Sequence, residues 1–147
     1  MNKRRRSRRP VSPVGSVVFS LLGTAQAVET RLEEAARSAG LSLAKLGVLR
    51  LLAQASRPLP LSELATIQHC VRSNITQLMD RLEKDGLVRR RRDPDDRRGV
   101  LAELTPAGRQ AHAKGMRALV EAQHAIMSGL KANDVANLKS ALKALEF

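Results

Sequence analysis

Aromatic residues are almost absent from this chain of 147 residues, which has two phenylalanines and no tryptophan or tyrosine. Apolar residues still make up 43% of it, so the core must consist of leucine, valine, alanine and isoleucine. Strands favour aromatic and β-branched residues, and this aliphatic composition favours helices over an all-β sandwich. The length is that of one domain with a real core.

Cysteine is equally scarce. The single Cys70 cannot form an intramolecular disulfide, so nothing calls for an oxidising compartment. No run approaches the roughly 18 apolar residues of a membrane span. The arginine-rich residues 3–9 and the uncharged residues 10–28 imitate an export signal, but the apolar stripe continues through Leu32 and Ala36 beyond the supposed cleavage point. We therefore expect an attached helix and a cytoplasmic protein without a membrane partner.

The groupings of residues that support catalysis or metal binding are also missing. The histidines at 69, 112 and 124 have no Cys, Asp or Glu at metal-ligand spacing, so we interpret them as surface or interface residues. We find no glycine-rich phosphate loop, nucleophile motif or carboxylate pair. The sequence predicts no enzyme activity, no metal and no cofactor.

Positive charge is abundant, with a formal net charge of +12. Half of that excess lies within the first nine residues, at Lys3, Arg4, Arg5, Arg6, Arg8 and Arg9. A charge balance of this kind indicates a polyanionic partner, with nucleic acid as the first candidate. Residues 1–13 cannot bury enough apolar surface to order themselves, and we interpret them as a flexible basic arm that either tracks phosphates or is an idle tail.

The remaining residues, 14–147, are predicted to form one mainly helical domain with a small β-hairpin. Apolar spacing predicts a helix over about 16–39 that ends at Gly40, and a second helix capped by Ser42. Pro60 suits the first turn of a short third helix. After a turn at 68–71, a helix over 72–84 ends at Gly86.

Two short strands, 87–91 and 100–104, flank the turn-forming residues Asp93-Pro94-Asp95-Asp96. Thr105 and Pro106 then begin a long helix that continues to about Leu130. Asn133 is predicted to cap a last helix, whose leucines recur at three and four residues, the spacing of a seam with a partner helix.

The helix over 72–84 is the clearest amphipathic segment. Its apolar positions, Ile75, Leu78, Met79 and Leu82, share one face. The opposite face carries polar groups, and Arg, Asn and Gln are the side chains that pair bidentately with base edges in the major groove. The candidate base-contacting and phosphate-contacting residues of this helix are Arg72, Ser73, Asn74, Thr76, Gln77 and Arg81. An ordinary solvated helix face explains the same pattern.

The hairpin favours the DNA interpretation. It has six arginines within ten residues, at 89–92 and at 97 and 98, whereas three aspartates compensate only half of that charge. A phosphate backbone is the natural partner of such a cluster. An arginine at a hairpin tip can also enter the minor groove, where the negative potential is deepest.

Several motifs in this region closely resemble the MarR (multiple antibiotic resistance regulator) family, over about residues 41–109. They are Ser62-Glu63-Leu64-Ala65, Thr76-Gln77-Leu78-Met79-Asp80-Arg81-Leu82-Glu83-Lys84-Asp85-Gly86-Leu87-Val88, Asp93-Pro94-Asp95-Asp96-Arg97-Arg98 and Leu104-Thr105-Pro106-Ala107-Gly108-Arg109. The combination of the wing motif with the following L-T-x-x-G is specific to the family.

The resemblance implies a winged helix-turn-helix lobe over 41–105 and dimerisation helices over 14–40 and 106–147. It implies a homodimer on an inverted-repeat operator in double-stranded DNA, with the 72–84 helix in the major groove. Arg97 and Arg98 would be at the wing tip, with Arg98 reaching the minor groove and Asp96 steadying it. It further implies a transcriptional regulator, typically a repressor released by a small-molecule effector held between the dimerisation helices and the recognition lobe.

Three alternatives stay open from the residues. An RNA-associated basic winged-helix module is disfavoured because exposed aromatic residues for base stacking are missing. A redox-responsive regulator would act through Cys70, although a buried packing thiol is the better interpretation. An adaptor that binds other proteins would use the terminal helices alone.

Overall fold

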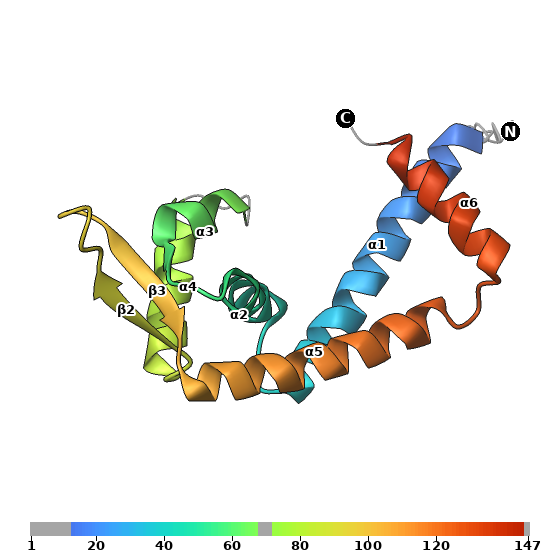
Figure 1. Cartoon of the computed structure of the whole chain (residues 1–147). Helices are drawn as coiled ribbons and strands as arrows, with labels where there is room; N and C mark the ends of the chain where they lie inside the picture. Colours follow the sequence, from blue (N-terminus) through green and yellow to red (C-terminus); the bar gives the residue numbers. More distant parts are fainter. Residues whose placement is uncertain (1–12, 68–71, 146–147) are drawn as a thin grey trace, which may run out of the picture.

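The computed structural model describes residues 13–67 and 72–145 and is mainly helical with one small sheet, as the sequence predicts (Figure 1). The elements, in chain order, are α1 (Pro13–Ser38), α2 (Leu43–Ala55), β1 (Leu59–Pro60), α3 (Leu61–Ile67), α4 (Arg72–Lys84), β2 (Val88–Arg92), β3 (Val100–Leu104), α5 (Pro106–Met127) and α6 (Ala132–Lys143). Figure 1 shows a compact lobe of α2, α3, α4 and the sheet, from which α5 leads away to α6, next to the long α1.

The core lies inside that compact lobe and is aliphatic. Its largest fully buried side chains come from α2, β1, α3, α4 and β2, and they are Leu46, Val48, Leu49, Leu59, Leu64, Ile75, Met79, Leu82 and Val88. No polar or charged residue is buried in the part of the chain that the structure describes. Because the three helices and the sheet share these side chains, the lobe packs as a single unit.

The sheet has a third strand that the sequence analysis missed. Its order is β1-β3-β2, with both pairings antiparallel, and Leu59 pairs with Ala102 of β3. Pro60 was predicted to open the third helix, but it closes β1 instead and the helix begins at Leu61. A proline is tolerated there because β1 is an edge strand, where a missing N–H disturbs no ladder.

Glycines end two helices as predicted. Gly40 and Gly86 adopt left-handed conformations, with φ of 79° and 71°. Ser42 caps α2 by accepting a hydrogen bond from the N–H of Lys45. The carboxylate of Glu33 on α1 accepts another from the N–H of Leu43 at 2.8 Å, so α1 helps to cap α2.

Some boundaries differ from the sequence-based ones. The first helix already begins at Pro13, and α5 ends at Met127 rather than near Leu130. The last helix has Lys131 as its N-cap instead of Asn133. The reason is Asp134, whose carboxylate accepts a hydrogen bond from the N–H of Lys131 at 3.1 Å and closes the first turn two residues earlier.

Helices long and apolar enough to cross a membrane are not found among the described residues.

Candidate nucleic-acid interface

Helix α4 turns its two faces to different surroundings. Ile75, Met79 and Leu82 are completely buried against the core. The polar residues of the other face are exposed, among them Asn74, Thr76, Gln77, Asp80, Arg81 and Lys84. The amphipathic character predicted from spacing is therefore confirmed, and the polar face is directed away from the core.

Two other predicted site residues, Arg72 and Ser73, are the first two residues of α4. Their side chains lie outside the part of the chain that the structure describes. His69 and Cys70 lie outside the described residues, so the packing and redox interpretations of Cys70 stay predictions.

The arginines of the wing divide into two groups. Arg90 on β2 is partly buried and turned toward α4, where it contacts the carboxylates of Asp80 at 2.6 Å and Glu83 at 3.5 Å. It also donates a hydrogen bond to the carbonyl oxygen of Thr76 at 3.0 Å. Arg89 forms an ion pair with Glu103 on β3. These two arginines are therefore neutralised within the lobe.

The six arginines that the sequence places in this hairpin therefore do not share one environment. Alternation along β2 places Arg90 on the face that meets α4 and Arg91 on the opposite face, and Arg92 at the end of the strand is exposed as well. Arg97 and Arg98, in the loop between β2 and β3, are exposed as well. Five of the six arginines are therefore exposed, and one of these five, Arg89, is paired with Glu103.

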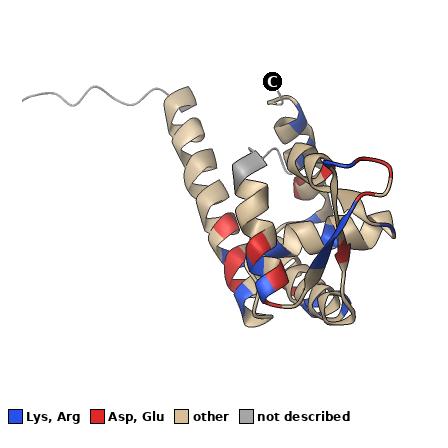
Figure 2. Cartoon of the chain, turned by 90° about the vertical axis from the view of Figure 1, so that its left-hand side faces the viewer, with Lys and Arg blue, Asp and Glu red and all other residues tan. Residues whose placement is uncertain are grey.

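The loop that joins β2 and β3 is held by its own aspartates. Asp93 accepts a hydrogen bond from the N–H of Asp95 at 3.0 Å, and Asp96 accepts one from the N–H of Arg98 at 2.9 Å. Backbone bonds between Asp93 and Gly99 and between Gly99 and Asp96 close the turn. Figure 2 shows basic residues along the wing strands and both signs of charge in this loop. The aspartates therefore shape the loop that carries Arg97 and Arg98.

A second surface is apolar and exposed, and it lies on the helices outside the compact lobe. Every residue of α6 between Ala132 and Lys143 is exposed. Phe19 on α1 is 72% exposed. The other exposed large apolar residues of these helices are Val14, Val17, Val18, Leu21, Leu22, Val120, Leu138 and Leu142, together with Val135. Met127, Val135, Leu138 and Leu142 line an apolar groove of about 340 Å³.

His112 and His124, the two histidines that the structure describes, belong to no group of metal-binding side chains. Groups of three or more His, Cys, Asp or Glu side chains that could hold a metal ion do not occur among residues 13–67 and 72–145. His124 is exposed on α5. His112, by contrast, has a ring nitrogen, Nε2, that is buried and has no hydrogen-bond partner. Burial, with a smaller contribution from the positive charge of Arg50, lowers the pKa of His112.

Two helices, α3 and α4, followed by a strand hairpin on a shared core define a winged helix-turn-helix. Residues 41–100 match the model of the MarR family. The resemblance to this family is thereby confirmed over the compact lobe.

Solved structures agree over nearly the whole chain. Sco3205, a MarR family transcriptional regulator from Streptomyces coelicolor in complex with DNA, is 28% identical with a TM-score of 0.81, covering 96% of this chain and 91% of its own. A probable transcriptional regulator from Pseudomonas aeruginosa is 27% identical with a TM-score of 0.77, covering 94% and 100%. A mutant MarR from E. coli complexed with operator DNA is 22% identical with a TM-score of 0.80, covering 94% and 99%, and this likeness concerns the fold alone. No curated protein matches the chain.

Proposed function

We propose that this protein is a transcriptional regulator that binds an inverted-repeat operator in double-stranded DNA as a homodimer. The observation that supports the proposal best is the pairing, on one lobe, of an exposed polar helix face with exposed wing arginines. A recognition helix and a wing of this kind reach adjacent grooves of one duplex. Sco3205, which shares the fold, was solved in complex with DNA.

In this proposal α4 enters the major groove. Asn74, Gln77 and Arg81 are exposed there, and their side chains form the bidentate hydrogen bonds that distinguish base pairs. Thr76 adds a methyl group and a hydroxyl, and Arg72 and Ser73 begin the helix at the end that contacts bases. The polar face of α4 therefore supplies the sequence preference.

The wing would supply affinity rather than sequence preference. Arg97 and Arg98 project from a loop that Asp96 orders through its bond to the N–H of Arg98. An arginine held at such a tip can enter the minor groove and neutralise phosphates. Asp96 acts in this proposal as the support of the wing.

The second copy would cover the apolar surface of α1, α5 and α6. Monomeric proteins rarely leave so much contiguous apolar surface exposed. Residues 14–40 and 106–147 would thus form the dimerisation part of the domain, and 41–105 the DNA-binding lobe. Twofold symmetry of the dimer requires two half-sites about one helical turn apart.

The regulator would act as a repressor that a small-molecule effector releases from DNA. The support for an effector site comes from cavities at the junction between the dimerisation part and the DNA-binding lobe. One, of about 280 Å³, is lined by Leu43, Leu46, Gly47, Arg50, Met116 and Leu119 of α2 and α5. A larger one, of about 500 Å³, lies at the other end of α2.

The test is a selection from a random-sequence duplex library, followed by competition with structured RNA. We expect an inverted repeat to be enriched, and we expect this duplex to displace RNA of equal length and not to be displaced by it. Binding should weaken steeply with salt, because each neutralised phosphate contributes about −0.9 to the log–log slope. The proposal would be contradicted if the selection enriched no duplex sequence, or if the protein bound RNA in preference to duplex DNA.

A further inference from the structure

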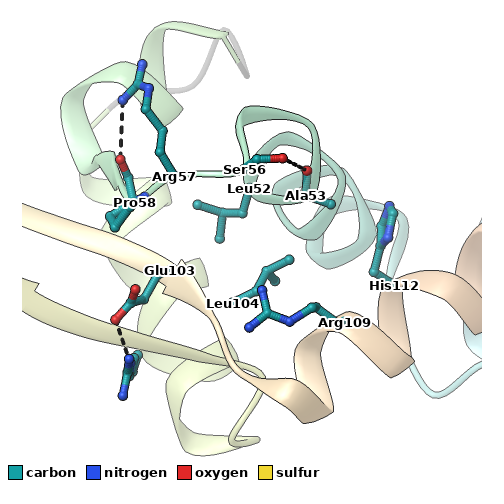
Figure 3. A pocket seen from close by; sticks show the side chains of 10 residues that line it. Leu52, Ala53, Ser56, Arg57, Pro58, Glu103, Leu104, Arg109 and His112 are labelled. Carbon is teal, nitrogen blue, oxygen red and sulfur yellow. Dashed lines mark hydrogen bonds and ion pairs between the residues drawn. The ribbon is translucent and has the colours of Figure 1, made fainter.

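The turn that ends helix α4, residues 85–87, is bonded to the start of α5. Thr105 lies where β3 passes into α5, between Leu104 and Arg109 (Figure 3). Its hydroxyl donates a hydrogen bond to the carbonyl oxygen of Gly86 at 2.7 Å, and its backbone N–H donates one to the carbonyl oxygen of Leu87 at 3.1 Å. The C-terminal end of the recognition helix is therefore fixed to a helix of the proposed dimerisation part.

Helix α2 contacts the same turn through an ion pair. The ammonium group of Lys45, in the first turn of α2, pairs with the carboxylate of Asp85. The Lys45 side chain is 20% exposed and that of Asp85 is 41% exposed, so the pair is partly shielded from water. Shielding reduces the screening by salt that weakens a fully exposed ion pair. The pair thus joins the start of α2 to the end of α4.

The first turn of α2 is also bonded to α1. The carboxylate of Glu33 on α1 accepts a hydrogen bond from the backbone N–H of Leu43 at 2.8 Å, and it pairs with Arg37 at 3.3 Å. The hydroxyl of Ser42 accepts a hydrogen bond from the backbone N–H of Lys45 at 3.2 Å and orders the same turn. Polar contacts therefore lead from α1, through the first turn of α2, to the end of α4.

Asp85 occupies a position where the helix itself disfavours an acid. The C-terminal end of a helix carries a partial negative charge, which repels a carboxylate beside it. The backbone N–H of Asp85 donates to the carbonyl oxygen of Arg81, so the residue lies at that end of α4. The ion pair with Lys45 offsets the repulsion. An acid at this position is therefore explained by the contact with α2 and not by the stability of α4 alone.

A small rotation about this end of α4 has a large effect at the other end. The helix has 13 residues with a rise of about 1.5 Å for each, so it is about 20 Å long. A tilt of about 5° about Asp85 moves the first turn of α4 by about 1.7 Å, whereas hydrogen-bond lengths vary by only about 0.5 Å. The exposed Asn74 and Gln77, in the first half of the helix, contact bases in the proposed complex. A modest tilt would therefore disrupt base contacts.

We propose that Lys45 and Asp85 are positioning residues for operator recognition. Their ion pair fixes the tilt of α4 relative to α2, and the hydrogen bond between Glu33 and α2 relates that tilt to α1, a helix of the proposed dimer interface. The pair thereby sets the separation of half-sites that the two recognition helices of the dimer accept. The inference rests on the proposed function, because it concerns how the dimer reads the spacing of its operator.

The two members of the pair distinguish positioning from direct contact with DNA. If Lys45 bound an operator phosphate, Lys45→Met would weaken binding, and Asp85→Asn, which removes a repelling negative charge, would strengthen it. Because the pair positions α4, we expect both changes to weaken binding to the preferred operator about three- to tenfold. Both should also reduce the discrimination against operators whose half-sites are one base pair closer together or farther apart. Fluorescence anisotropy on this series of duplexes measures both effects.

Three controls separate positioning from folding and from net charge. Lys114→Met removes the same charge from an exposed position on α5 and should leave affinity within about twofold. The melting temperatures of Lys45→Met and Asp85→Asn should stay within about 3 °C of the wild type, because a partly exposed ion pair contributes little to stability. Exchanging the charges, with Lys45→Asp and Asp85→Lys in one chain, should restore affinity and spacing preference, since each new charge suits its helix end.

The assignment would be overturned by tighter binding in Asp85→Asn, or by a charge-exchanged protein that binds no better than the single variants. The angle between α1 and α4 is measured without DNA, from residual dipolar couplings of the full-length protein. We expect it to change by about 5° in Lys45→Met and in Asp85→Asn, and to be unchanged in Lys114→Met.

The two proposals fail separately. A changed angle in a protein that binds no duplex DNA would support the positioning of α4 by the pair and contradict the proposed function. An unchanged angle, or an inverted repeat that both variants bind with unaltered spacing preference, would overturn the positioning role alone.

Discussion

The guanidinium of Arg90 on β2 lies 2.6 Å from the carboxylate of Asp80 on α4. The same arginine reaches Glu83 and the carbonyl oxygen of Thr76, so one side chain connects the wing to three positions of the recognition helix. The Arg90 side chain is only 23% exposed. This contact fastens together the two elements that are proposed to enter adjacent grooves.

Replacing Arg90 with glutamine should loosen this connection. We expect the free energy of unfolding to fall by about 1 kcal/mol, because Asp80 loses its ion pair and the carbonyl of Thr76 loses one donor. Glu83 keeps the hydrogen bond from the backbone N–H of residue 90, and Asp80 stays accessible to water. The measurement is chemical denaturation. Arg91→Gln, on the exposed side of the same strand, should change stability by less than about 0.5 kcal/mol. Equal reductions in the two variants would show that Arg90 does not stabilise the fold.

Removing the wing-tip guanidinium should alter the salt dependence of DNA binding. For Arg98→Ala we expect weaker operator binding and a log–log salt slope that is shallower by about 0.9 for each phosphate that is no longer neutralised. The slope is obtained from fluorescence anisotropy at several salt concentrations. Arg31→Ala removes one exposed charge from α1 and should leave the slope unchanged. An unchanged slope in Arg98→Ala would refute the role of the wing.

A methyl group at Gly108 should be poorly tolerated. The Cβ of an alanine there would overlap the carbonyl oxygen of Leu87, which accepts a hydrogen bond from the N–H of Thr105. Because backbone would have to move, we expect Gly108→Ala to reduce the free energy of unfolding by about 2 to 4 kcal/mol. Gly129→Ala, with open space around its Cβ, should have little effect. Thermal unfolding of both variants makes the comparison, and similar melting temperatures would contradict the close approach.

A charge in the apolar groove of α6 should disrupt the dimer. Leu138 is 40% exposed and lines that groove, so Leu138→Glu would place a carboxylate in the proposed interface. We expect sedimentation equilibrium to show a shift from dimer to monomer, because an unpaired buried charge is costly. Ser140→Glu is on the opposite side of α6 and should stay dimeric. A dimeric Leu138→Glu would exclude this groove from the interface.

The partly buried ring of His112 should make stability depend on pH. Its pKa is lowered in the folded protein from an ordinary value of 6.5, so the unfolded chain binds the proton more readily. The stabilisation from the neutral ring is complete above about pH 6.5 and is lost as the pH falls toward the folded-state pKa. Denaturation between about pH 7.5 and pH 5 should therefore show a smaller loss of stability in His112→Gln than in the wild type or in His124→Gln. Parallel curves of stability against pH for all three proteins would contradict this role of His112.

Local signals predicted most of the elements correctly. The spacing of Ile75, Met79 and Leu82 predicted α4 and its buried face, and Gly40 and Gly86 marked helix ends. Each of these signals depends on residues within about one or two helical turns of one another, so it can be recognised from the sequence alone. The strand β1 escaped notice because two residues have no periodicity, and its pairing with β3 joins segments about 40 residues apart.

What the sequence by itself determined is the aliphatic helical class, the amphipathic recognition helix, and the position of the wing with its surplus of arginine. Only the tertiary structure decided which arginines are paired, since packing brings acids to Arg89 and Arg90. It also decided that Arg109 and His112 line a cavity together with residues of α2 and β3. Periodicity and capping are short-range properties of the chain, whereas ion pairing and cavities depend on how distant segments pack.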